Sequence, residues 1–253
     1  MNNKLIIILS LLCSVIKGNH TVTLSMIVKN EADRYLPQVL IAAREYIHAA
    51  VIIDDGSTDN TMQVCRELLQ GIPLILIENN QSKFHNEITL RMQQWNETIN
   101  TNPEWILFLD ADEIFEESFK NYLPNLLSQY EYDVFFFRLY DFWNMTHYRE
   151  DQYWYAHQTY RPFLLRYNKD FNYIWPNLAQ HCGRMPQNVG CLKVGYSHLR
   201  LKHYGWAKYD DRVSKYNRYM TLDPEAKYGW KEQYDSILDA NPHLIEWHEQ
   251  EAI

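Results

Sequence analysis

The sequence lacks any block of basic residues and carries more acidic than basic side chains. Its 253 residues include 24 Lys and Arg against 32 Asp and Glu, which gives a formal net charge of −8. A surface of this sign repels the phosphate backbone of nucleic acids. We therefore expect no nucleic-acid partner.

Cysteine is sparse, and its spacing excludes the common zinc-binding patterns. The four cysteines are Cys13, Cys65, Cys182 and Cys191. They form no Cys-x-x-Cys pair, so neither a zinc finger nor a dithiol redox motif is expected. Cys182 and Cys191 could be bridged in an oxidising compartment, and two free thiols are at least as good an alternative.

The sequence has one long apolar run, near its start. Residues 5–16 (LIIILSLLCSVI) are mostly apolar and follow a short polar segment with one positive charge. This run has the length of the hydrophobic part of a signal peptide and is shorter than the roughly 20 residues of a spanning helix. Residues 1–20 are therefore interpreted as an apolar N-terminal segment, either a signal or anchor that would allow membrane association, or an additional buried strand. Two locations stay open: the cytoplasm, or a secretory lumen if residues 1–19 act as a signal or anchor.

From residue 21 onward, short β-branched runs alternate with helical patterns. The expected strands are residues 21–29, 49–54, 74–78, 105–109, 134–138 and 163–166, and the expected helices are residues 33–46, 57–70, 84–100 and 210–222. Strands that alternate with helices predict an α/β fold, with a mostly parallel sheet sandwiched by helices. No linker or repeat interrupts the chain, so residues 21–138 and 139–253 are expected to be two halves of one domain.

Paired carboxylates follow two of the expected strands. Asp54 and Asp55 end one strand, and Asp110 and Asp112 follow another. Ligands bind at the carboxyl ends of parallel strands, so these acids are expected to face the same crevice. Such a cluster is costly without a cation, and a divalent ion held by carboxylates and substrate phosphates would relieve the repulsion.

These residues resemble glycosyltransferase family 2. The resemblance rests on three segments in the family's order and spacing, which together cover roughly residues 21–115: Met26–Glu31, Ile53–Thr61 and Phe108–Glu113. Three linked motifs are far more specific than a single Asp-x-Asp. The resemblance implies a GT-A, Rossmann-like fold, a nucleoside diphosphate sugar donor (a UDP-sugar by family frequency), Mn²⁺ or Mg²⁺, and inversion at the anomeric carbon. The acceptor would be a glycan, a protein or a small molecule, bound by the aromatic-rich half formed by residues 139–253.

The resemblance also assigns roles to single residues. The residues assigned to the nucleotide sugar are Val28, Asn30, Glu31, Asp54, Asp55, Arg91, Asp110 and Ala111. Asp55 would contact the base with support from Asp54, and Asp112 would bind the metal and so take part in catalysis. Asp110 would approach the ribose or the metal. Arg91 resembles an arginine near the donor diphosphate, and its alternative is an ordinary surface arginine of a helix.

The general base and the last metal ligand are expected in the second half. Inverting transfer needs a base that accepts the acceptor proton, and the candidates are Asp141, Glu150, Asp151 and His181. We favour Asp151, because Glu150-Asp151 resembles the acidic pair that many family members place on the acceptor side. His203 is placed where GT-A enzymes often add a histidine to the metal shell, and a hydrogen-bonded structural histidine is the alternative.

Two other functions compete with this interpretation. A metal-dependent nucleotidyltransferase would also use carboxylates at strand ends, but it usually has a glycine-rich loop after the first strand, and this sequence reads Lys29-Asn30-Glu31-Ala32 there. A catalytically weak relative kept for carbohydrate binding is the second alternative, and intact Asp110 and Asp112 argue against it.

Overall fold

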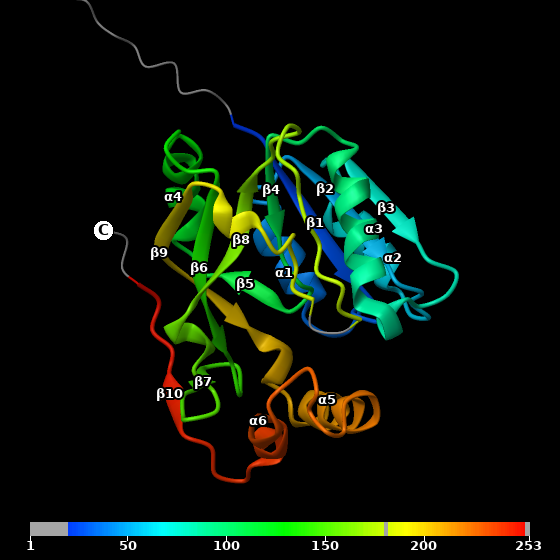
Figure 1. Cartoon of the computed structure of the whole chain (residues 1–253), viewed down its shortest axis with the longest axis vertical. Helices are drawn as coiled ribbons and strands as arrows, with labels where there is room; N and C mark the ends of the chain where they lie inside the picture. The colour runs from blue at the N-terminus through cyan, green and yellow to red at the C-terminus, as the bar shows by residue number, and fades with distance from the viewer. Residues whose placement is uncertain (1–19, 180–181, 251–253) are drawn as a thin grey trace, which may run out of the picture.

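The computed structural model describes residues 20–179 and 182–250 of the chain (Figure 1). The apolar run over residues 5–16, Cys13 and the candidate base His181 lie outside the described residues. No helix within the described ranges is both long and apolar enough to span a bilayer.

Eight strands form a single sheet in the order β3-β2-β1-β4-β8-β6-β9-β5. Their bounds are β1 Val22–Val28, β2 Ala49–Asp54, β3 Leu74–Glu78, β4 Trp105–Phe108, β5 Glu113–Phe115, β6 Val134–Asp141, β8 Tyr160–Arg166 and β9 Val194–His203. Four of the seven neighbouring pairs are parallel: β1 with β2, β1 with β4, β2 with β3, and β6 with β9. The predicted α/β fold with a mostly parallel sheet is confirmed.

The order of the strands reverses beside β1. The chain moves outward from β1 to β2 and β3, then returns to the other side of β1 as β4. Crevices that bind ligands form at such a reversal, at the carboxyl ends of the strands. In this chain the segments that leave these ends are residues 29–32 after β1 and 109–112 after β4.

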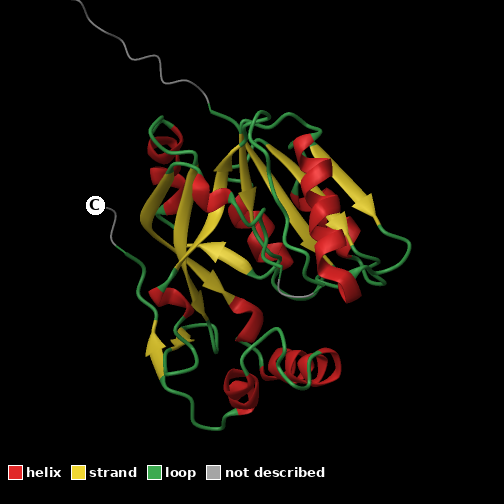
Figure 2. Ribbon diagram, in the orientation of Figure 1, coloured by secondary structure: helices red, strands yellow, loops and turns green. Residues whose placement is uncertain are grey.

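Helices cover both faces of this part of the sheet (Figure 2). Three helices, α1 Leu36–Ala43, α2 Thr61–Leu68 and α4 Phe119–Leu127, pack with one face into the largest core cluster. The helix α3 Glu87–Ile99 packs on the other face through Leu90 and Trp95. Both faces of the parallel strands are therefore buried, as their apolar sequences require.

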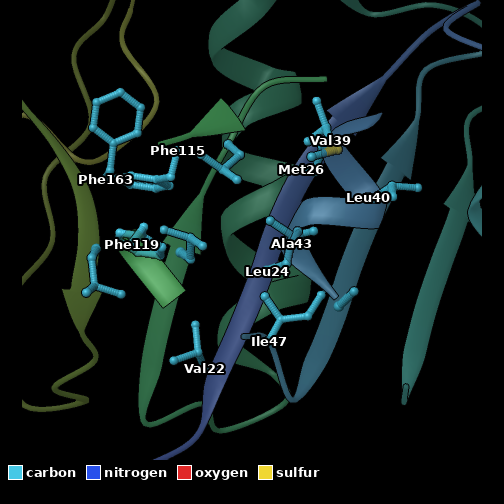
Figure 3. Packing of buried hydrophobic residues seen from close by; sticks show 14 of the residues in the cluster. Val22, Leu24, Met26, Val39, Leu40, Ala43, Ile47, Phe115, Phe119 and Phe163 are labelled. Carbon is cyan, nitrogen blue, oxygen red and sulfur yellow. The ribbon is translucent and has the colours of Figure 1, made fainter. Parts of the chain in front are cut away.

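Strand β1 shows how the alternation of side chains divides the two layers. Val22, Leu24 and Met26 lie in the core cluster with the apolar side of α1 (Figure 3), since alternate residues of a strand share a face. On the other face the Ser25 hydroxyl lies 2.8 Å from the Thr98 hydroxyl of α3. The strand is fixed on both sides, and this fixes the position of its carboxyl end.

The second half adds a smaller layer beside the sheet. It contains the two-stranded sheet of β7 (His147–Arg149) and β10 (Leu244–Glu246), and the helices α5 (Tyr209–Leu222) and α6 (Lys231–Asp235). In Figure 1 these elements gather below the sheet, next to the ends of β6 and β9. Short 3-10 turns complete the chain: η1 Phe84–Asn86, η2 Ala156–Gln158, η3 Val189–Cys191, η4 Tyr204–Trp206 and η5 Ser236–Leu238.

Two helices begin later than their sequences predicted. The expected helix over residues 33–46 spans only Leu36–Ala43, because Pro37 fits the first turn, where no amide hydrogen bond is lost. The helix expected to start at Ser57 or Thr58 starts at Thr61 instead. Asp59 accepts hydrogen bonds from the amide and hydroxyl of Thr61, so the preceding residues form a turn rather than a helix cap.

Candidate active site

The loops that follow β1 and β2 are locked together. Asn30 adopts a left-handed conformation with φ of 53°, which asparagine tolerates better than most residues. Its amide donates to Ser57 Oγ at 2.9 Å, and its side-chain oxygen accepts from the Thr58 amide at 2.7 Å. The Glu31 amide donates to Thr61 Oγ1 at 2.8 Å. These bonds hold the predicted nucleotide-pocket segment Val28 to Glu31 at the edge of the sheet.

Asp54 and Asp55 are fully buried and organise the turns beside that segment. Asp54 accepts a hydrogen bond from the Ser57 amide at 2.7 Å. Asp55 accepts bonds from the Asn79 side chain at 2.9 Å, the Ser82 hydroxyl at 2.6 Å and the Lys83 amide. Asp55 thus fixes the loop after β3, and its predicted contact with a base stays a prediction.

Gly56, between these turns, has a φ of +78°. A Cβ there would lie 3.2 Å from the Asn79 carbonyl oxygen, so both the conformation and the space favour glycine.

Asp110 lies between two arginines. Arg91 of α3 donates to Asp110 Oδ1 at 3.1 Å, and Arg184 Nη2 lies 3.6 Å from Asp110 Oδ2. Burial alone would raise the pKa of Asp110, but Arg91 and Arg184 outweigh it and lower the pKa. Arg91 therefore lies beside the first aspartate of the Asp-x-Asp motif, and its predicted place near the donor diphosphate stays a prediction.

Glu113 fixes the turn that presents the motif. It is 1% exposed, forms a two-bond ion pair with Arg184, and accepts a hydrogen bond from the Asp110 amide at 2.8 Å. Ala111, which lies between Asp110 and Asp112 in the sequence, is buried in the core cluster. Its burial directs Asp110 and Asp112 away from the core. The Arg184 guanidinium also lies 4.2 Å from the centre of the Phe163 ring.

Asp112, His203 and Asp141 form a group in which the imidazole lies between the two carboxylates. His203 Nε2 lies 3.5 Å from Asp112 Oδ2, and His203 Nδ1 lies 2.7 Å from Asp141 Oδ1. Burial opposes the charged imidazole, but the two carboxylates prevail and raise the pKa of His203 to about 9. Burial also opposes ionisation of Asp112, yet His203 and Lys215 bring its pKa far below the usual range.

The same group fits a divalent ion in part. Ligand atoms lie ~2.1 Å from a bound Mg²⁺ or Zn²⁺, so atoms 3.5 Å apart such as His203 Nε2 and Asp112 Oδ2 would both reach one ion. A carboxylate on the far ring nitrogen, as Asp141 provides, is the usual support of a metal-binding histidine. Within residues 20–179 and 182–250 no group of three or more His, Cys, Asp or Glu side chains is arranged to hold a metal. Substrate oxygens would therefore have to complete the shell, and Asp110 is engaged by arginines instead.

A cavity of about 470 Å³ opens beside this group. Asp110, Asp141 and His203 line it on one side, and Arg161 and Arg184 also contribute to its wall. Its remaining wall is largely aromatic: Trp154, Trp206, Tyr219, Tyr228, Trp230 and Tyr234. Tyr228 and Trp230 are 39% and 38% exposed, so their rings are accessible to a bound molecule.

Asp151 lies in a different place. Its carboxylate accepts hydrogen bonds from Arg149 Nε at 2.5 Å and from the amides of Tyr153 and Trp154 at 2.9 and 3.1 Å. Together with Glu150 it borders another hollow, while Asp141 borders the cavity of Asp110 and His203. The role of Asp151 as a base stays a prediction, and its contacts in the structure are those of a turn.

Two charged residues of this region were not singled out from the sequence: Arg184 and Lys215. Arg184 and Lys215 approach the motif from segments about 70 and 100 residues further along the chain. In the folded chain, a Cβ at Gly205 would collide with Lys215 Nζ, Asp112 Oδ2 and His203 Nε2. Of the described cysteines, Cys65, Cys182 and Cys191 are free thiols.

Comparisons with known proteins agree with this fold. The chain is similar in structure to S. aureus TarS, with a TM-score of 0.54 at 14% identity over 86% of this chain and 42% of that chain. The TarS fragment 1–349 gives a TM-score of 0.53 in complex with UDP and 0.52 in complex with UDP-GlcNAc. Both matches have 14% identity and cover 86% of this chain, with 69% and 70% of the fragment. These likenesses support the fold.

The chain therefore spans less than half the length of full-length TarS. A search of curated proteins found no match. The family model for glycosyl transferase family 2 matches residues 23–184, which is more than half of the chain and includes all three sequence motifs. The chain belongs to glycosyltransferase family 2.

Proposed function

We propose that this protein transfers a sugar of the hexose type from a nucleoside diphosphate sugar to a hydroxyl acceptor, with inversion and with the help of Mn²⁺ or Mg²⁺. A uridine donor is supported by the TarS fragment, whose complexes contain UDP and UDP-GlcNAc. The observation that carries the proposal is the convergence of Asp112 Oδ2 and His203 Nε2 at 3.5 Å, at the edge of the sheet where the strand order reverses.

The nucleotide is proposed to lie across the ends of β2, β1 and β4. Neighbouring strands are ~4.8 Å apart, so Asp55 after β2 and Asp110 after β4 are separated by about 10 Å across the sheet. A nucleoside diphosphate is long enough to cover this span. The base would then lie beside the loops after β1 and β2, and the diphosphate beside Asp112.

The chain's own residues would act on the donor by position and charge. Arg91 and Arg184 hold Asp110 in place, and Asp141 holds His203 with its Nε2 toward Asp112. A bound divalent ion would neutralise the charge that develops on the leaving diphosphate. The metal is expected to bind the neutral imidazole, so its binding would release a proton from His203.

The acceptor is proposed to enter the aromatic cavity of about 470 Å³. Rings such as Tyr228 and Trp230 would stack on the apolar face of a sugar, while Asp141 and Arg161 offer polar partners. Two carboxylates are candidates for the base that accepts the acceptor proton: Asp151 from the family resemblance, and Asp141 from its position in the cavity.

The test is release of UDP from UDP-GlcNAc, UDP-glucose and UDP-galactose with Mn²⁺, with Mg²⁺ and with EDTA. Asp112→Asn should lower turnover about 100-fold or more, as expected when one group that stabilises transition-state charge is lost. The control is Asp170→Asn, which makes the same change from aspartate to asparagine at an exposed position away from the site.

Two results would reject the proposal in favour of the alternatives. UDP binding without any turnover would indicate a carbohydrate-binding relative. Formation of pyrophosphate from UTP and a sugar phosphate, without release of UDP, would indicate a nucleotidyltransferase.

A further inference from the structure

A lysine of α5 occupies the space beside the proposed metal ligands. Lys215 Nζ lies 3.7 Å from Asp112 Oδ2 and 4.3 Å from the centre of the Trp206 ring. Its side chain is 16% exposed, which is low for a lysine. The absence of a side chain at Gly205 creates the space, because a Cβ there would collide with Lys215 Nζ and with Asp112. The ammonium group is therefore seated at the site rather than extended into solvent.

The helix that carries Lys215 is attached beside the site both by partly buried side chains that pack on the cluster of Trp206 and Tyr234 and by polar contacts. None of its residues is fully buried. Asp211, one turn before Lys215 on the same side of the helix, pairs with Arg34 at 3.0 Å. Arg212 donates to the carbonyl oxygens of Trp206 and Trp143 at 2.5 and 3.0 Å. These bonds position α5 so that Lys215 points at Asp112.

The charges around Lys215 explain what it does before a donor binds. Asp112 Oδ2 faces both His203 Nε2 and Lys215 Nζ, at 3.5 and 3.7 Å. Glu31 is also close enough for its charge to interact with Lys215. The ammonium thus balances carboxylates that would otherwise repel each other.

A donor diphosphate at this edge brings negative charge to the same place. Lys215 Nζ lies 3.7 Å from Asp112 Oδ2, which is beyond hydrogen-bond distance, so phosphate oxygens would offer its ammonium group the charge-assisted hydrogen bond that Asp112 does not. We propose that Lys215 binds the donor's diphosphate, so that the protein keeps part of its nucleotide affinity when the metal is removed. This inference rests on the proposed function, because it takes a nucleoside diphosphate as the ligand.

The test measures binding of UDP and of uridine by calorimetry, in EDTA and in Mn²⁺, to the full chain. Lys215→Gln should weaken UDP binding about tenfold in EDTA, the size of one charge-assisted hydrogen bond. The loss should be smaller in Mn²⁺, where the ion supplies charge. Uridine has no phosphate, so its affinity should not change, and Lys215→Arg should retain most of the UDP affinity.

The matched control is Arg218→Gln, which removes a cation from an exposed position on the same helix and should leave UDP binding unchanged. Equal UDP affinity of Lys215→Gln and wild type in EDTA would overturn the inference. A parallel loss of uridine binding would also overturn it, since it would indicate a structural role. If the wild-type chain binds no UDP even with Mn²⁺, the uridine-donor proposal fails, and that result is distinct from a failure of Lys215 alone.

Discussion

Asp141 and His203 form a pair in which one residue determines what the other can do. Asp141 Oδ1 lies 2.7 Å from His203 Nδ1, and this contact directs Nε2 toward Asp112. Asn at position 141 would keep the shape of the side chain but lose its charge, so the imidazole would be held less firmly. We expect Asp141→Asn to raise the Mn²⁺ concentration for half-maximal activity by about 10-fold to 100-fold.

A titration of activity and of Mn²⁺ binding checks this, with Asp151→Asn measured in parallel. Collapse of turnover at unchanged Mn²⁺ affinity would contradict a supporting role and assign Asp141 as the general base. Collapse of turnover in Asp151→Asn, with normal folding, would instead support the base expected from the family resemblance.

Glu31 gives a prediction about pH. Burial raises its pKa from 4.5 to about 7, only partly opposed by Arg34, and Asp112 adds to the rise. Between these two values the folded chain holds a proton that the unfolded chain has lost, so this group makes stability fall as pH rises through the window. Glu31→Gln should remove that fall and stabilise the protein by roughly 1–3 kcal/mol at pH 8.

Urea denaturation at pH 5 and pH 8 measures the effect. Glu45→Gln is the control, since Glu45 is exposed at the end of α1. Equal pH dependence in Glu31→Gln and wild type would show that the carboxyl of Glu31 ionises normally in the folded chain.

At the scale of elements, the turn η4 brings β9 and α5 together at the site. The Tyr204 amide donates to the Asp112 carbonyl oxygen at 2.8 Å, and Gly205 leaves room for three side chains. Gly205→Ala would force His203, Asp112 or Lys215 to move. A displacement of about 1 Å in catalytic groups costs on the order of 100-fold in rate, so we expect a loss of that size in UDP release.

Gly190→Ala is the control for an added methyl group, because a Cβ at Gly190 meets no atom within 4 Å. Melting temperatures of both variants separate a local shift from loss of the fold. Full activity of Gly205→Ala would show that η4 adapts without moving the site.

Comparison of the expected helices and strands with the structure shows which features could be predicted from the sequence and which could not. The strands β1 to β4 and the acids after them were predictable, because apolar runs and strand ends are local patterns, whereas β5, β7, β9 and β10 were not predicted. Asp110 and Asp112 were singled out in this way, whereas His203 was singled out only from the family resemblance. Arg184 and Lys215 were not, since long side chains from distant segments reach the motif only after the chain has folded. The late start of α2 was missed because Asp59 binds the Thr61 amide locally and stabilises a turn.

At the scale of the whole molecule, one buried arginine connects the elements of the second half. Arg149 of β7 is 1% exposed and contacts Asp151, Asp239 and the Ser236 carbonyl oxygen at 2.5, 2.6 and 2.7 Å. Its guanidinium also lies 4.7 Å from the centre of the Trp143 ring. β7 is thereby joined to η5 and the segment that leads into β10, which together support one side of the aromatic cavity.

Removal of this arginine should loosen the second half more than the first. Arg149→Met keeps the apolar stem but removes the partner of the Asp151 and Asp239 carboxylates and of the buried Ser236 carbonyl, which we expect to cost about 1–3 kcal/mol. The exposed Arg44 provides the control, and Arg44→Gln should change stability by less than about 0.5 kcal/mol. Hydrogen exchange should show the largest loss of protection in β7, η5 and β10, with β1 and β2 unchanged. Uniform loss across both halves would mean that the chain unfolds as one cooperative unit, and that Arg149 contributes to the whole domain rather than to its acceptor side.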